Sequence, residues 1–174
     1  MKRCRSHFWC MKTTIPAVDG FAHITLPIHD LDAAERFYVA LLGAALVRKV
    51  DRETFLRIRP DRAAEADADN SPLHLAVLFP DAPELHLFLE PGVGRHTPKP
   101  HPHIAMNVDH DELDRCMECL ASNGIPFDGP RRLGPPGHAS VYFADPSGNL
   151  LEWVTTRYEG RVEEGPPDVA KLAW

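Results

Sequence analysis

Two histidines occupy equivalent places in two similar stretches of the chain. His23 opens the sequence His-Ile-Thr-Leu-Pro-Ile, and His103 opens His-Ile-Ala-Met-Asn-Val. Each stretch is followed by aspartate-containing turn residues and by an amphipathic segment that ends in glycine, at Gly43 and at Gly124. A lone histidine on a strand is usually structural, but imidazole nitrogens can also bind metals or move protons. Because these two histidines recur within a repeat, we expect them to be functional.

The alternation of apolar and polar residues predicts which strand faces carry the polar groups. In the first strand the apolar residues at positions 24, 26 and 28 share one face, and His23 lies on the other. The strands that begin at residues 84, 103 and 149 alternate in the same way. We expect helices to cover the apolar faces, so the opposite faces would line a pocket. The chemically active residues on these faces are His23, His86, His103 and Glu152.

Two amphipathic helices should position these strands. Asp30 or Asp32 can cap the first helix, because a short carboxylate accepts from free backbone N–H groups, and the second helix should begin near residues 109–111. The buried stripes are predicted to be Ala33, Phe37, Ala40 and Leu41 in the first helix, and Leu113, Cys116, Met117 and Leu120 in the second. The predicted unit is therefore strand, helix and further strands, and it occurs twice.

Composition excludes several classes of partner. The formal net charge is −6, so the chain lacks the basic footprint expected of a nucleic-acid-binding protein. No apolar run approaches the length of a membrane span. With four cysteines and no export signal, a disulfide framework is not expected, and the cytoplasm is the default location. Cys116 and Cys119 lie within a predicted helix, where core packing explains them better than metal binding does.

Three segments are expected to lie outside the repeated core. Residues 1–20, which begin with a basic leader, are expected to lie outside the fold. Met11 is a second candidate start site. Residues 60–72 are expected to form an exposed polar loop or a lid. The tail from Glu159 is rich in glycine, proline and charge, and is expected to be extended and packed through Trp174 on the body or on a partner.

The same residues resemble the glyoxalase, bleomycin-resistance and extradiol-dioxygenase superfamily, also called vicinal oxygen chelate. The resemblance runs from about Phe21 to Thr156, and its motifs identify the superfamily without identifying a reaction. It is carried by the stretch from His23, by Asp-Leu-Asp-Ala-Ala-Glu-Arg-Phe-Tyr at 30–38 running to Gly43, by the stretch from His103, and by Asp-Pro-Ser-Gly-Asn-Leu-Leu-Glu at 145–152.

The resemblance implies an α+β fold of two βαβββ modules that form an open, cup-shaped mixed sheet with helices outside. The implied organisation is a leader at 1–20, a first module at 21–98, a second module at 99–157 and a C-terminal extension at 158–174. It also implies a homodimer, with a small molecule as the substrate.

The resemblance further implies one divalent metal, held by His23, His103 and Glu152. The family's fourth ligand position falls near His86, where a carboxylate is expected of glyoxalases, so His86 is either a ligand or an acid–base group. Tyr142 and His138 are further candidate catalytic residues, and Glu90 is interpreted as a solvated strand end. Two histidines and one carboxylate leave metal positions open, as in non-haem Fe(II) sites; Mn, Ni and Zn also accept such ligands.

Three functions remain open. The open triad favours an Fe(II) dioxygenase that chelates a substrate through vicinal oxygens. The stretch from Ser140 to Gly148 resembles the final hairpin of the fosfomycin-resistance transferases, which supports a metal-dependent isomerase or thiol transferase. Those transferases need cationic groups for a phosphonate, and no matching cluster follows Glu152 except Arg157. The basic pair Arg131 and Arg132 is expected in a loop. The third hypothesis is a non-catalytic, drug-sequestering protein, because one scaffold carries many functions.

Overall fold

The structure is a computed structural model that describes residues 20–68, 71–90 and 95–173. The expected leader therefore lies outside the described residues except for Gly20, and so does Trp174. No helix in these three ranges is long and apolar enough to cross a membrane.

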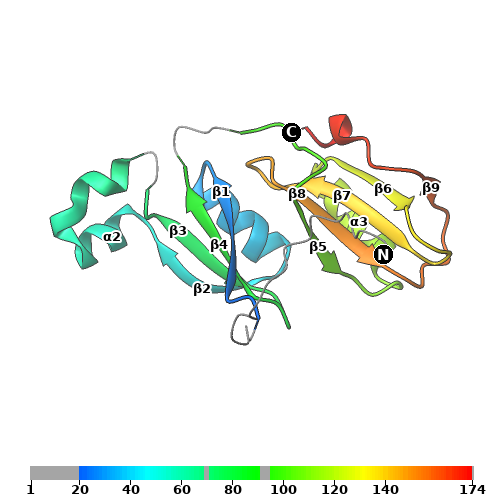
Figure 1. Cartoon of the computed structure of the whole chain (residues 1–174), viewed down its shortest axis with the longest axis horizontal. Helices are drawn as coiled ribbons and strands as arrows, with labels where there is room; N and C mark the ends of the chain where they lie inside the picture. The colour runs from blue at the N-terminus through cyan, green and yellow to red at the C-terminus, as the bar shows by residue number, and fades with distance from the viewer. Residues whose placement is uncertain (1–19, 69–70, 91–94, 174) are drawn as a thin grey trace, which may run out of the picture.

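The first sheet contains four strands in the order β1-β4-β3-β2 (Figure 1). They are β1 (His23–Ile28), β4 (Glu84–Leu89), β3 (His74–Leu78) and β2 (Ala45–Val50). β1 pairs with β4 in parallel, and the other two pairings are antiparallel. The parallel pairing requires the chain to cross over between β1 and β2, which is where the first helix lies.

The second sheet repeats this order and adds one strand at its edge, giving β5-β8-β7-β6-β9. The strands are β5 (His103–Asn107), β8 (Leu150–Thr155), β7 (Ala139–Ala144), β6 (Phe127–Arg132) and β9 (Glu163–Glu164). β5 is parallel to β8, as β1 is to β4. The predicted α+β class is confirmed, and the described strands form two mixed sheets without closing into a barrel.

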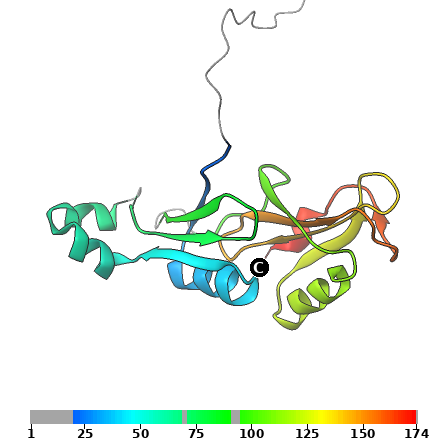
Figure 2. The ribbon, with the colours of Figure 1, turned by 90° about the horizontal axis from the view of Figure 1, so that it is seen from below.

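Helices cover one face of each sheet. Figure 2 shows α1 (Leu31–Glu35) with the π-helix η1 (Arg36–Leu41), and α3 (Leu113–Ser122), on the same side of the two sheets. The main core lies between these helices and the strands, as the alternation predicts. Its fully or almost fully buried members include Ile28, Tyr38, Leu75, Leu87, Leu113, Leu120, Val141, Phe143 and Leu151. Neither α1 and η1 nor α3 covers the opposite faces of the two sheets, and these faces hold the polar residues.

The first helix begins at the expected cap, but its second half is a π-helix and not an α-helix. The Asp30 carboxylate accepts a hydrogen bond from the Ala33 N–H at 2.8 Å, which confirms the predicted cap. From Arg36 the turns widen, and the Leu42 N–H donates to the Phe37 carbonyl, five residues back, at 3.0 Å. Wider turns rotate the buried stripe away from 3.6-residue spacing. The predicted burial of Ala40 is therefore wrong, and Tyr38 is fully buried instead.

The expected loop at residues 60–72 is largely helical, so that prediction is wrong. The helix α2 (Arg52–Ile58) is followed directly by the 3-10 helix η2 (Pro60–Asp67). Asp51 caps α2 by accepting from the Thr54 N–H at 2.8 Å. The pair buries a small cluster of Phe55, Ala66 and Leu73 at the outer end of the first sheet (Figure 1). Two buried side chains in two short helices give little periodic signal, which explains the error.

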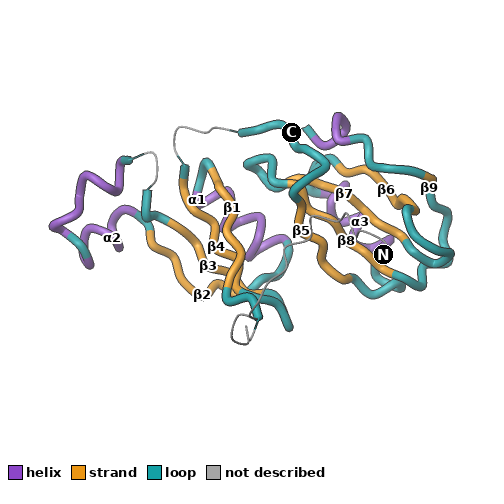
Figure 3. The backbone as a smooth tube through the Cα atoms, viewed as in Figure 1, coloured by secondary structure: helices purple, strands orange, loops and turns teal. Residues whose placement is uncertain are grey.

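The turn between β7 and β8 joins the two halves of the chain. Its Asp145 is fully buried and accepts from the Tyr38 hydroxyl at 2.9 Å. Asn149 Nδ2 donates to the Pro27 carbonyl at 2.8 Å, and Ser147 Oγ accepts from the His29 N–H at 3.1 Å. In Figure 3 this turn, drawn in teal, reaches toward the first sheet. These contacts fix one sheet against the other.

Candidate metal centre

His103 and Glu152 meet on the face of the second sheet that lies opposite α3. They lie on the neighbouring strands β5 and β8, with Ala105 opposite Glu152 in the parallel register. Their side chains converge, and His103 Nε2 lies 2.9 Å from Glu152 Oε2. Glu152 is buried, whereas about a quarter of the His103 side chain is exposed (23%). Two of the predicted ligands are therefore in direct contact.

The hydrogen-bond partners of His103 limit what can lie between it and Glu152. His103 Nδ1 lies 2.9 Å from the Pro100 carbonyl oxygen, which can only accept, so Nδ1 carries the hydrogen. Because the Glu152 carboxylate also only accepts, His103 Nε2 meets it through either a proton or a cation. Two ligands about 2.1 Å from a metal at right angles are about 3 Å apart, which fits the observed separation.

The Tyr142 hydroxyl stands beside Glu152. It donates to Glu152 Oε1 at 3.1 Å. Burial raises the pKa of Tyr142 to about 12, and the neighbouring Glu152 carboxylate contributes to this rise, so the phenol stays protonated and can donate. Ser140, two residues before Tyr142 on the same strand, is fully buried, and its hydroxyl interacts with that of Tyr142.

Replacing Tyr142 by phenylalanine should weaken metal binding without unfolding the chain. The change removes one hydrogen bond that orients Glu152, and such supporting contacts are typically worth about 10- to 100-fold in metal affinity. We expect a loss of about 10-fold, measured by titrating Mn(II) against a competing chelator. Tyr158→Phe is the matched control, because the Tyr158 hydroxyl bonds Asp114, in α3 and away from Glu152. An unchanged affinity in Tyr142→Phe would remove Tyr142 from the site.

The first sheet holds the other two predicted ligands. The rings of His23 and His86 are stacked, with centroids 4.5 Å apart and planes inclined by 6°. His74 continues this row at 5.8 Å from His86. Glu84 Oε2 lies 2.8 Å from His86 Nε2, and this hydrogen bond lowers the pKa of the Glu84 carboxyl. Since a carboxylate accepts, His86 Nε2 carries the hydrogen, and in a neutral ring Nδ1 holds the lone pair.

The chain does not bring the predicted triad together. The ligand atoms of His23, His103 and Glu152 do not all lie within 4.8 Å of one another. Within the described ranges, only one group of three potential ligands has all its ligand atoms within this distance. It is formed by Asp109, His110 and Asp111, in a turn before α3. The four predicted ligands instead form two pairs, one on the face of the first sheet opposite α1 and one on the face of the second sheet opposite α3. Metal binding by the triad therefore stays a prediction.

Other predicted residues lie apart from this centre. His138 lies in the loop before β7, where its ring packs close to Gly134 and its buried Nδ1 has no hydrogen-bond partner among the described residues. Arg131 and Arg132, expected in a loop, lie in β6, and Arg131 is buried in a salt bridge with Asp128. This buried pair could not be predicted from the sequence, because the prolines and glycines around it conceal the strand pattern.

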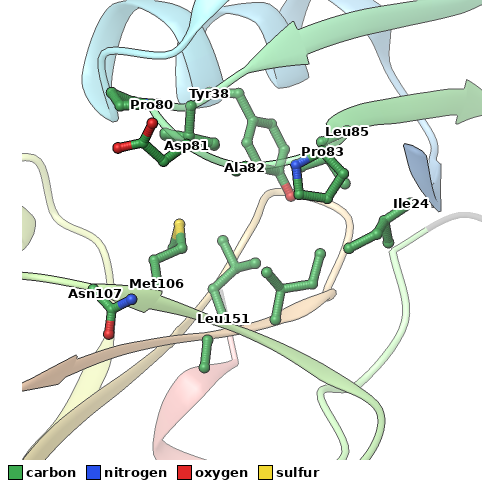
Figure 4. Close-up of a pocket in the computed structure, with 13 residues that line it drawn as sticks. Ile24, Tyr38, Pro80, Asp81, Ala82, Pro83, Leu85, Met106, Asn107 and Leu151 are labelled. Carbon is green, nitrogen blue, oxygen red and sulfur yellow. The ribbon is translucent and has the colours of Figure 1, made fainter. Parts of the chain in front are cut away.

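Two cavities lie between the sheets. One of about 470 Å³ is mostly apolar and includes Tyr38, Met106 and the turn at 79–83, without any predicted ligand (Figure 4). The other, of about 500 Å³, is bounded by β1, β5 and the segment before β5, and its wall includes Thr25, Lys99, His103 and Leu150. The second cavity is large enough for a small ligand and borders His103, so it is the better candidate.

Comparison with known proteins gives one family. The model of the Glyoxalase/Bleomycin resistance protein/Dioxygenase superfamily matches residues 20–153. A glyoxalase/bleomycin resistance protein/dioxygenase from Alicyclobacillus acidocaldarius is 24% identical, with a TM-score of 0.56 over 84% of this chain and 96% of that one. A mutant of the fosfomycin resistance protein FosX from Listeria monocytogenes, complexed with Mn(II) and 1S,2S-dihydroxypropylphosphonic acid, is 21% identical, with a TM-score of 0.58 over 79% and 92%.

Proposed function

Because the chain belongs to the glyoxalase/bleomycin resistance protein/dioxygenase superfamily, we propose that it is a divalent-metal enzyme that binds a small substrate through adjacent oxygens. The observation that carries the proposal is the 2.9 Å contact between His103 Nε2 and Glu152 Oε2, two ligand atoms from neighbouring strands that are separated as two ligands of one metal would be. In this proposal His103 and Glu152 hold the metal together with His23.

A second copy of the chain would complete the centre. His23 and His86 share the face of the first sheet opposite α1, and His103 and Glu152 share the face of the second sheet opposite α3. His23 is exposed, so it is free to meet another subunit. We propose a homodimer in which the first sheet of each subunit covers the second sheet of the other, so that the partner subunit's His23 joins His103 and Glu152.

Different residues have different roles at this proposed centre. The Pro100 carbonyl holds the His103 ring, and the Tyr142 hydroxyl holds the Glu152 carboxylate. His86, hydrogen-bonded to Glu84, is placed as a fourth ligand or as an acid–base group. The metal, when bound, acts as a Lewis acid that stabilises developing negative charge on substrate oxygens.

Two reaction classes fit this arrangement. Addition to, or isomerisation of, a small oxygen-bearing substrate is favoured by the Tyr142 hydroxyl, which can donate beside the metal. FosX shares the fold, and its mutant was obtained with Mn(II) and a dihydroxy phosphonic acid. A dioxygenase reaction is the second candidate, because two histidines and one carboxylate are the donor set of non-haem Fe(II) sites. Bound Mn, Ni or Zn would support the first, and bound iron with oxygen uptake on catechols the second.

A mixing experiment tests both the metal and the dimer. His23→Ala and Glu152→Gln should each bind little metal alone, whereas dimers re-formed from an equal mixture should regain about one quarter of the wild-type metal, because each mixed dimer holds one intact centre. Elemental analysis of anaerobically purified protein, with size-exclusion chromatography and light scattering, measures this. No recovery would place the centre within one chain. If the wild type itself bound no metal, the chain would be a binding protein without metal chemistry.

A further inference from the structure

The segment that leads into β5 forms one wall of the cavity beside His103. Residues 95–102, here called the linker, precede β5 and are drawn in green in Figure 1. The linker lies tightly over the turn between β7 and β8, where the His96 N–H donates to the Ser147 carbonyl at 3.0 Å. A Cβ at Gly148 would lie 1.9 Å from the His96 carbonyl oxygen, so only glycine allows this approach. This end of the wall is therefore fixed to the turn.

The other end of the linker is fixed to His103. The Pro100 carbonyl oxygen lies 2.9 Å from His103 Nδ1, and the His101 ring stacks on the His103 ring with centroids 5.4 Å apart. Pro98, between the two ends, is buried, and Lys99 follows it and borders the cavity. Because both neighbours of Lys99 are held, the backbone places this side chain at the wall before any ligand binds. Less conformational freedom is then lost on binding.

The wall of this cavity carries basic side chains and no acidic ones among the described residues that line it. Its basic residues are Lys99, His96, His101 and His103. The formal net charge of the chain is −6, so an acid-free wall stands out from the rest of the molecule. The other described lysines, Lys49 and Lys171, are bound to carboxylates, whereas no described residue forms a salt bridge with Lys99. The described part of the chain therefore leaves the Lys99 ammonium without a counter-charge.

The rest of the cavity wall is mainly apolar. The apolar lining residues are Ile24, Leu26, Pro27, Pro102, Ile104 and Leu150. Thr25 and Thr97 add two hydroxyl groups that can donate to a ligand oxygen. Apolar walls lower the local polarity and so strengthen the attraction between opposite charges. The cavity therefore matches a ligand with a small apolar body and an anionic end.

We propose that this cavity binds a small organic anion, with the negatively charged oxygens against Lys99 and the apolar body against β1 and β5. The proposal rests on the proposed function, because it takes the anion to be the substrate of the centre at His103. His103 borders the cavity, so a molecule held there lies next to a proposed metal ligand. Lys99 then selects charged substrates over neutral ones of the same shape.

Three ligands that share a benzene ring test the role of charge. Benzoate and phenylphosphonate are anions and benzyl alcohol is neutral, and isothermal titration calorimetry measures their binding to the metal-free full chain at low salt. We expect the wild type to bind at least one anion more tightly than the alcohol. Lys99→Met should weaken the binding of that anion by about fivefold, as expected for a charge pair at an exposed side chain. Added salt should weaken the binding of the anions and leave that of the alcohol unchanged.

Two further variants serve as controls. Lys99→Arg keeps the positive charge and should keep most of the affinity for the anion. Arg115→Gln removes one positive charge from α3, on the other side of the second sheet, where the Arg115 side chain is 80% exposed. Its affinity should stay within about twofold of the wild type, because solvent and salt screen a distant exposed charge. Tighter binding of phenylphosphonate would assign the cavity to phosphate-like groups, and tighter binding of benzoate to carboxylates.

A Mn(II) titration of the same proteins separates this proposal from the proposed function. If the wild type binds Mn(II) but prefers neither anion over the alcohol, the metal centre stands and the anion site is overturned. The same holds if Lys99→Met keeps the wild-type affinity for both anions. If the wild type binds no Mn(II) but prefers an anion through Lys99, the proposed function is overturned and the anion-binding cavity stands.

Discussion

Replacing Glu152 by glutamine is expected to lower the affinity of the protein for Mn(II) by more than about 100-fold, which is beyond the 10- to 100-fold range of residues that only orient ligands. The amide keeps the shape of the side chain but removes the negative charge that offsets the dipositive metal. It also allows the contact with His103 to be kept, because an amide N–H can donate to Nε2 at 2.9 Å. The variant should therefore stay folded while losing its metal.

The measurement is a titration of metal-free protein with Mn(II) against a competing chelator, with unfolding followed in urea. Glu90→Gln is the matched control, since Glu90 follows β4 and has no place in the proposed centre; its affinity should stay within about twofold of the wild type. If Glu152→Gln bound Mn(II) as tightly as Glu90→Gln, the carboxylate would not be a ligand. The contact with His103 would then be a simple histidinium–glutamate ion pair.

Replacing Asp145 by alanine is expected to lower the free energy of unfolding by about 3 kcal/mol or more. The carboxylate accepts from the Ser147 and Asn149 N–H groups, from Asn149 Nδ2 and from the Tyr38 hydroxyl, at 2.8 to 2.9 Å. Burial raises the pKa of Asp145 in spite of these donors. Alanine would leave three of these donors buried without a partner and would leave Asn149 Nδ2 with the Pro27 carbonyl alone. An orphaned buried donor costs about 1–3 kcal/mol.

Urea unfolding followed by circular dichroism measures this loss. Asp111→Ala is the control, because Asp111 is exposed and its replacement should change the free energy of unfolding by less than about 0.5 kcal/mol. Tyr38→Phe removes a single donor and should cost about 1 kcal/mol, so it calibrates the larger effect. A loss below about 1 kcal/mol in Asp145→Ala would mean that the two sheets are joined elsewhere.

The repeat and the faces of the strands could be predicted from the sequence alone. Two-residue alternation forces His86 onto the side opposite Leu85 and Leu87, and the structure buries those leucines against the helices. The cap at Asp30 could be predicted for the same reason: both depend on interactions within a few residues. Local rules of this kind need no knowledge of how distant segments meet.

The features that could not be predicted depend on contacts between distant parts of the chain. Strand alternation predicts that His23, His103 and Glu152 lie on pocket-facing sides, but which of them are in contact depends on how the two sheets pack against each other. The C-terminal tail docks on the second sheet, with Leu172 buried, through hydrogen bonds to Asp128, which is far away in sequence, and the tail offers no periodic pattern. The expected packing through Trp174 falls on a residue outside the described ranges.

The turn at residues 145–149 limits how this protein can change over evolutionary time. It locks the two sheets together, and Glu152 follows Asn149 by only three positions, so a change that relieves one role disturbs the other. The helices α2 and η2 bury a small cluster of their own at the outer end of the first sheet, and they can accept insertions at little cost. New length and new surface are therefore expected to accumulate around α2, while the turn stays fixed.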